Sequence, residues 1–162
     1  MDMKLMALKE ADIFTQLSAS QLEEIARICS EQTCNLGDTI LVEGSHGHDL
    51  YLIAQGEVEV MINLALVSPA DSSESQPITI TTLRRGQSFG EMALVDRGIR
   101  SATVRVTQHN TRLLVITSED LLKLCENDTL LGYRIMYNLA ADLAMKVRNN
   151  GLFLRDALLN QE

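Results

Sequence analysis

The stretch from Gly37 to Ile116 restricts the possible folds more than any other part of the chain. Short runs of apolar residues, many of which are β-branched, alternate there with glycine-containing turns. Many short strands at this spacing are typical of a β-barrel or jelly roll. One run, 58–64, alternates apolar and polar side chains, which predicts a strand paired in a hairpin with 78–83. Its inward face would consist of Val58, Val60, Ile62 and Leu64.

Helical periodicity flanks this stretch on both sides. Ser18 precedes apolar residues at helical spacing, which predicts a helix over 18–31 with Ser18 as its cap. After Ile116, Ser118 is expected to cap one helix, and a second is expected to begin at Asn127 and Asp128. The second carries a broad apolar face, wider than packing on one barrel wall requires. That face is formed by Leu131, Ile135, Leu139, Leu143 and Val147, flanked by Met136, Ala140 and Ala144.

These patterns predict a mainly β protein with flanking helices. At 162 residues and 46% hydrophobic, the chain is long enough for one domain with a core, so we expect a single domain over residues 1–162. The barrel, a double-stranded β-helix or jelly roll, would occupy residues 36–117. N-terminal helices would fill residues 1–35, and two to three C-terminal helices would fill residues 118–162, leaving no length for an output domain.

Charge and composition exclude several kinds of partner. The net charge of -8 opposes direct binding to nucleic acid or to an anionic membrane. We find no apolar run near the roughly 18 residues that a membrane span needs, and no signal-peptide core, so a cytoplasmic location is expected. The scattered cysteines fit neither a zinc site nor a disulfide framework, and reduced thiols are the expectation.

The segment 89–104 has the residues needed to hold one phosphate and one sugar. Gly90 lets the backbone come close to a ligand, and the stretch that follows can turn a row of N–H groups toward an anion. Arg100 provides a planar, charged fork that matches two phosphate oxygens. Glu91 then needs a hydrogen-bond donor, and a ribose hydroxyl is one.

This segment closely resembles the phosphate-binding cassette of cyclic nucleotide-binding domains. The matching residues are Gly90, Glu91, Met92, Ala93 and Leu94, then Arg100, Ser101, Ala102, Thr103 and Val104. Further landmarks in the family order are 14–18 with Leu22, 37–40, 43–44 and 49–60. The resemblance extends over roughly residues 10 to 150.

The resemblance implies a set of ligand-binding residues. Glu91 would accept a hydrogen bond from the ribose 2′-hydroxyl, with Gly90 at the sugar, and backbone N–H groups of Ala93 and Ser101 would contact the phosphate. Family members that prefer cAMP and family members that prefer cGMP both carry hydroxyl residues at the position of Ser101. Ser101 therefore does not decide between the two ligands. The base-covering residue would come from the last helices. The full set is Gly90, Glu91, Met92, Ala93, Arg100, Ser101 and Ala102.

The expected function is that of a cyclic-nucleotide sensor, with cAMP favoured over cGMP as the ligand. The signal would leave through rearrangement of the helices after residue 118, toward an unknown effector protein. The last helix either joins two copies in a homodimer or packs only on its own domain. No catalytic residues, and therefore no enzyme activity, are expected.

Three other interpretations stay open. A degenerate fold that serves as a protein-interaction module would be expected to lose Glu91 and Arg100, which are intact. A cupin-like metalloprotein would use His46, His48 and His109, but the expected glutamate is missing, so we expect exposed turn histidines and no metal. A phosphodiesterase would need a metal cluster or an activated nucleophile.

Two smaller features are assigned from the pattern alone. Gly44 and Gly56 are expected to serve the fold by permitting turns and bulges. The segment 68–77 contains both prolines and several serines, and is expected to be a mobile hairpin tip, with a regulatory loop as the alternative.

Overall fold

The computed structural model describes residues 2–63, 76–96 and 98–160. Most of the expected 68–77 hairpin tip therefore lies outside the described residues. The helices are α1 Met3–Glu10, η1 Asp12–Phe14, α2 Ala19–Ile28, α3 Met92–Asp96, α4 Ser118–Asn127 and α5 Thr129–Leu159. The strands are β1 Ser30–Cys34, β2 Thr39–Leu41, β3 Asp49–Gln55, β4 Glu57–Ile62, β5 Ile78–Arg84, β6 Ser88–Phe89, β7 Thr103–Val106 and β8 Thr111–Thr117.

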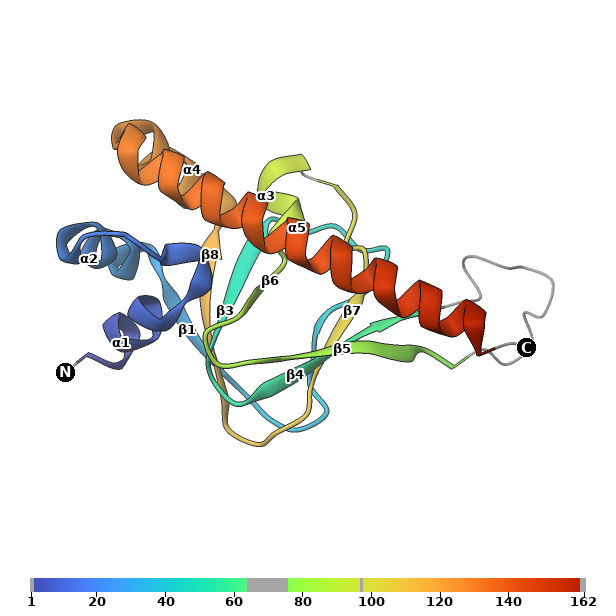
Figure 1. Cartoon of the computed structure of the whole chain (residues 1–162). Coiled ribbons are helices and arrows are strands. Elements are labelled where there is room, and N and C mark those ends of the chain that lie inside the picture. The colour runs from blue at the N-terminus through green and yellow to red at the C-terminus, as the bar shows by residue number, and fades with distance from the viewer. Residues whose placement is uncertain (1, 64–75, 97, 161–162) are drawn as a thin grey trace.

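The strands form two four-stranded antiparallel sheets, which confirms the predicted jelly roll. One sheet has the order β1-β8-β3-β6 and the other the order β2-β7-β4-β5. The predicted hairpin is present as β4 and β5, in which Val58 lies opposite Leu83. Apolar side chains from both sheets, among them Ile53, Val58 and Leu113, fill the barrel interior. Helices lie along one side of this barrel (Figure 1).

Strand β3 joins the barrel interior to the helical layer. Ile53 packs inside the barrel, whereas Leu50 and Leu52 pack with the helices. Successive side chains of a strand point to opposite faces, so a strand buried on both faces has a nearly continuous apolar sequence. β3 also carries Asp49 and Tyr51 toward the cassette, which places the candidate site at the edge of a rigid strand.

The helix predicted over 18–31 begins as predicted but ends earlier. Ser18 caps α2, and its side chain accepts a hydrogen bond from the Gln21 N–H while the Gln21 side chain accepts one from the Ser18 N–H. The helix expected over 18–31 stops at Ile28, and 30–34 is strand β1 instead of helix. The reason is tertiary, because β1 completes its backbone hydrogen bonds by pairing with β8.

Two further local predictions were wrong. The inward alternation of β4 breaks where its pairing with β5 shifts register between Val60 and Met61, and Met61 becomes the buried residue in place of Ile62. Helix α4 is capped by Thr117, whose hydroxyl accepts a hydrogen bond from the Asp120 N–H, and Ser118 is its first helical residue.

Two helices follow the barrel, and α5 continues through Gly151 as one long helix. Its first half is anchored to the N-terminal segment. The Asn138 amide donates to the carbonyls of Ile13 and Thr15 at 3.1 and 2.8 Å, and Arg134 donates to the carbonyl of Gln16. From there α5, orange to red in Figure 1, runs past α3 and across the barrel.

Only part of the predicted apolar face of α5 packs on the domain. Leu131, Ile135 and Leu139 are buried and Leu143 is half-buried, but Val147 is 68% exposed. Steps of four residues exceed the helical repeat of 3.6, so each step turns the side chain by roughly 40°. After four such steps Val147 lies on the far side of the helix from Leu131.

We predict that two glycines with similar backbone angles tolerate alanine differently. Gly44 and Gly56 have φ values of +81° and +92°, but an added Cβ would meet nothing at Gly44, whereas at Gly56 it would lie 2.2 Å from the Thr111 Oγ1 atom. Gly44→Ala should cost about 1 kcal/mol of unfolding free energy, from backbone strain alone. Gly56→Ala should cost about 1 to 3 kcal/mol more, because neighbouring atoms must move. Urea unfolding would measure both, and equal losses would contradict this account.

Candidate functional site

Arg100 is a buried cation to which the described residues offer no carboxylate partner. Its side chain belongs to a residue only 6% exposed. The guanidinium donates from Nη1 to the Gly90 carbonyl at 3.2 Å and from Nη2 to the Asp49 carbonyl at 3.1 Å. No carboxylate in the described part of the chain forms an ion pair with it. Because a buried charge is costly unless it is paired, this position is suited to an anion from outside the chain.

Two glycines flank the guanidinium. Gly90 has φ +81°, and an added Cβ would lie 2.7 Å from the Asp49 carbonyl oxygen and 2.9 Å from the Arg100 Nη1 atom. At Gly47 an added Cβ would lie 2.8 Å from the Nη2 atom. The sequence predicted Gly90 as a site residue but did not indicate Gly47. Nothing in the sequence ties Gly47 to a side chain 53 positions later.

The segment between β2 and β3 also fixes the backbone of Arg100. The Arg100 N–H donates to the Ser45 carbonyl at 2.8 Å, and the Gly44 N–H donates to the Arg100 carbonyl at 2.9 Å. Ile99 forms an isolated β-bridge with His46. These bonds hold the arginine backbone in place, so the guanidinium is positioned by its own main chain as well as by its carbonyl partners.

The remaining predicted cassette residues surround α3. At the start of α3 the Leu94 N–H donates to the Glu91 carbonyl at 3.1 Å, and the N–H groups of Met92 and Ala93 precede this bond in the chain. The Ser101 hydroxyl donates to the Met92 Sδ atom at 3.7 Å and joins the two halves of the cassette. Ala93 is buried, Ala102 is half-buried, and Ser101 and the Met92 side chain are exposed.

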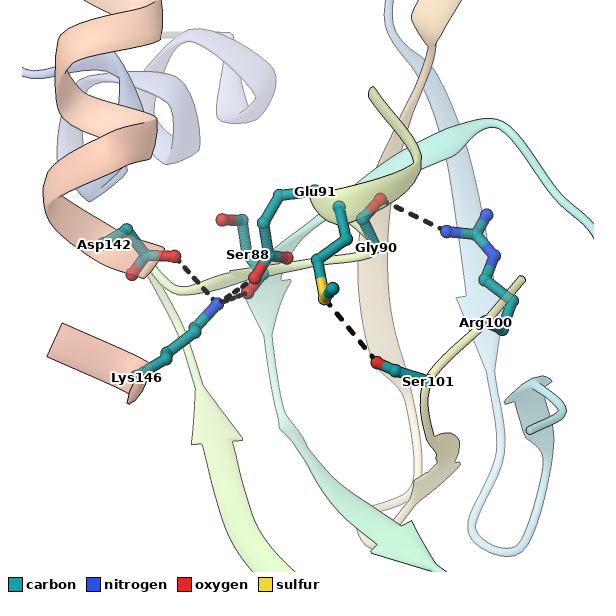
Figure 2. A network of polar contacts seen from close by, with 8 residues as sticks. Ser88, Gly90, Glu91, Arg100, Ser101, Asp142 and Lys146 are labelled. Carbon is teal, nitrogen blue, oxygen red and sulfur yellow. Dashed lines mark hydrogen bonds and ion pairs between the residues drawn. The ribbon is translucent and has the colours of Figure 1, made fainter. Parts of the chain in front are cut away.

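Glu91 faces α5 instead of Arg100. Its carboxylate Oε1 accepts a hydrogen bond from the Lys146 Nζ at 2.8 Å, and the glutamate is only 6% exposed. Lys146 also donates to the Ser88 carbonyl at 3.0 Å and forms an ion pair of 2.8 Å with Asp142, one turn earlier on α5. In Figure 2, Lys146 and Arg100 lie on opposite sides of Gly90.

Lys146 was not identified from the sequence. The sequence predicts that a residue of the last helices covers the base but does not indicate which one, and a lysine on a helix is ordinarily a solvated surface residue. Burial lowers the pKa of Lys146, but the charges and hydrogen bonds of Glu91 and Asp142 outweigh this and raise it above its ordinary value of 10.5. The lysine is therefore charged at neutral pH.

The histidines of the metalloprotein alternative do not converge. His46, His48 and His109 are all exposed. Within residues 2–63, 76–96 and 98–160, no group of three histidine, cysteine, aspartate or glutamate side chains is arranged to hold a metal ion. Among the same residues, no helix is long and apolar enough to cross a membrane.

Comparison with known proteins gives concordant matches. The family model of the cyclic nucleotide-binding domain matches residues 31–128. The cyclic AMP receptor protein of Thermus thermophilus is 31% identical over 147 residues, which are 91% of this chain and 62% of that protein. Human cGMP-dependent protein kinase 2 is 29% identical over 112 residues, which are 69% of this chain and 14% of the kinase.

Solved structures agree with the sequence matches. The crystal structure of the Thermus thermophilus catabolite activator protein has a TM-score of 0.74 at 30% identity, over 91% of this chain and 63% of that one. The chain spans less than two thirds of the length of each of these three relatives. The range matched by the family model, residues 31–128, contains the strands of the barrel and the cassette.

We predict that the stabilising effect of Lys146 is lost at high pH. A group whose pKa is raised on folding stabilises the folded protein below its unfolded pKa and stops doing so as the pH rises through its folded pKa. The difference in unfolding free energy between the wild type and Lys146→Met should be constant from about pH 8 to about pH 9. It should shrink above pH 10.5.

Lys123→Met is the control for this measurement. Lys123 forms an exposed ion pair with Glu119 on α4, and such pairs contribute little at any pH. Denaturant unfolding at each pH measures the difference in unfolding free energy between the wild type and each of the two variants. A Lys146 difference that stays constant well above pH 10.5 would contradict the buried ion-pair account.

Proposed function

The chain belongs to the cyclic nucleotide-binding domain family, and we propose that its cassette, residues 89–104, binds a 3′,5′-cyclic mononucleotide. The observation that carries the proposal is the buried Arg100 guanidinium, whose protein partners are two neutral carbonyls. A cyclic phosphate has one negative charge and two exocyclic oxygens. It would neutralise the arginine and accept two parallel hydrogen bonds from its fork.

The other cassette residues would complete the ligand contacts. Backbone N–H groups of Ala93 and Ser101 would donate to the phosphate, with Met92 and Ala102 beside them. Gly90 would allow the sugar to come close. Glu91 would accept from the ribose 2′-hydroxyl, and its ion pair with Lys146 supports this role because a neutralised carboxylate does not repel the phosphate.

We propose cAMP before cGMP as the ligand. Support comes from the Thermus thermophilus cyclic AMP receptor protein, which aligns with 91% of this chain. The 29% identity to a cGMP-dependent protein kinase keeps cGMP as the second candidate. The proposed role is binding without turnover, in the cytoplasm, where the three free cysteines stay reduced.

We further propose that α5 transmits the signal and joins two copies of the chain. Small and apolar residues recur along its exposed face at alternating steps of three and four, the spacing of a coiled-coil seam. This face is opposite the buried line of Leu131, Ile135 and Leu139. The seam consists of Leu130, Tyr133, Tyr137, Ala140, Ala144, Val147, Gly151, Leu154 and Leu158.

We predict a selective shift in thermal unfolding with one cyclic nucleotide. The purified protein would be unfolded to remove any copurified ligand, refolded, and heated with cAMP, cGMP or 5′-AMP. At about 100 times the Kd, a ligand adds about 2.7 kcal/mol, or roughly 5 to 10 °C for a domain of this size. Arg100→Leu should weaken binding by about 2 to 5 kcal/mol, because it leaves the phosphate unpaired.

Arg85→Leu is the matched control, since Arg85 forms an exposed ion pair with Glu10 away from the cassette. Its affinity for the nucleotide should equal that of the wild type. Unchanged affinity in Arg100→Leu would refute the assignment of the cassette as the nucleotide-binding site. No shift with any nucleotide would favour the degenerate interaction module.

We predict that a charge in the seam separates the two copies. Val147→Glu would bury a carboxylate against the partner helix, so this variant should sediment as a monomer at concentrations at which the wild type is a dimer. Asn149→Glu, an exposed position on the same turn but off the seam, should leave the dimer intact. Analytical ultracentrifugation distinguishes these results, and a wild-type monomer at high concentration would refute the seam.

A further inference from the structure

We propose that Lys146 is a positioning residue for the sugar: it holds Glu91 so that the carboxylate selects a ribose over a 2′-deoxyribose. This inference rests on the proposed function and deepens it. It assigns a specificity role to a residue 55 positions away from Glu91, on a different element. Figure 2 shows Lys146 reaching from α5 to the start of the cassette.

The geometry fixes both the lysine and the glutamate. Lys146 Nζ lies beside three oxygens: it donates hydrogen bonds to Glu91 Oε1 at 2.8 Å and to the Ser88 carbonyl at 3.0 Å, and it forms an ion pair with Asp142 Oδ2 at 2.8 Å. An ammonium group has three N–H donors, and these hydrogen bonds use two of them. Asp142 lies one turn before Lys146 on α5 and orients its ammonium group. The carbonyl of Ser88, in β6, holds the same group against the barrel.

The same contacts leave part of Glu91 available to a ligand. Lys146 occupies Oε1, whereas Oε2 has no hydrogen bond among the contacts of the described residues. A carboxylate oxygen only accepts, so Oε2 is matched to a hydroxyl donor and not to a phosphate oxygen. Because Oε1 is held, Oε2 is presented in one orientation, which is what selection of a single sugar hydroxyl requires.

Charge balance gives a second reason for the lysine. Glu91 and Asp142 carry two negative charges near the cassette, and Lys146 and Arg100 carry two positive charges. Without Lys146, an anionic ligand would enter beside two uncompensated carboxylates. A residue that only packed α5 against the barrel would affect all ligands alike, whereas this arrangement predicts an effect that depends on the 2′-hydroxyl.

The test is the ratio of two affinities, measured by calorimetry for cAMP and its 2′-deoxy analogue, or for the cGMP pair if cGMP binds more tightly. The wild type should prefer the ribonucleotide by about tenfold or more, the effect of a hydrogen bond to a charged group. In Lys146→Met this ratio should fall below about threefold, mainly through weaker binding of the ribonucleotide. Lys146→Arg, which keeps the charge, should recover part of the preference.

A double variant distinguishes action through Glu91 from a structural effect. Glu91→Gln should lower the ratio as Lys146→Met does, and combining the two should add little, because both remove the same interaction. Lys123→Met, an exposed lysine on α4, should keep the wild-type ratio. Thermal unfolding without ligand would verify that each variant is folded, and Lys146→Arg carries the test if the methionine variant is not.

The outcomes are separable. A wild type that binds neither nucleotide overturns the proposed function, and this inference with it. A wild type that binds, with Lys146→Met weakening both ligands by the same factor, overturns the inference alone and leaves Lys146 as a packing residue. If Lys146→Met loses the preference for the ribonucleotide and Lys146→Arg recovers part of it, the positioning role is supported.

Discussion

The burial of the Arg100 guanidinium against two backbone carbonyls is the interaction on which the site depends. It is possible only because Gly47 and Gly90 have no side chains to occupy the same space, and because the segment between β2 and β3 holds the arginine backbone. Hydrogen bonds from neutral carbonyls satisfy the donors but do not cancel the charge. The fold thus accepts an electrostatic cost at a position where an anionic ligand would remove it, as is common at functional sites.

The rest of the structure supports this one position. Strand β3 packs with the barrel on one face and with the helices on the other, so Asp49 at its start is fixed by both cores. The glutamate that follows Gly90 is paired from a different direction, by a lysine on α5. Two cations therefore lie on opposite sides of Gly90, Arg100 from the cassette itself and Lys146 from α5.

The sequence predicted what short-range patterns encode. Strand spacing predicted the jelly roll, Ser18 marked a helix start, and Gly90, Glu91 and Arg100 led to the interpretation of 89–104 as a phosphate-binding cassette. It did not predict Lys146 or Gly47, whose roles come from contacts between segments far apart in the chain. The sequence also did not predict strand β1, because pairing with β8 overrides a weak helical pattern there. Nor did it predict the exposure of the far end of α5, where apolar residues spaced by four come to lie on different sides of the helix.

The two halves of α5 differ in a way that bears on signalling. Arg134 and Asn138 bind the N-terminal segment, and beyond Asn138 Lys146 makes the only side-chain hydrogen bonds from α5 to the rest of the described chain. A ligand can shift a conformational equilibrium only through contacts that differ between the two states. The Lys146 network is where such a difference could arise, because it joins the cassette to the helix that carries the exposed seam. Because α5 is one continuous helix, a shift at Lys146 would be transmitted along it toward the apolar residues from Val147 onward.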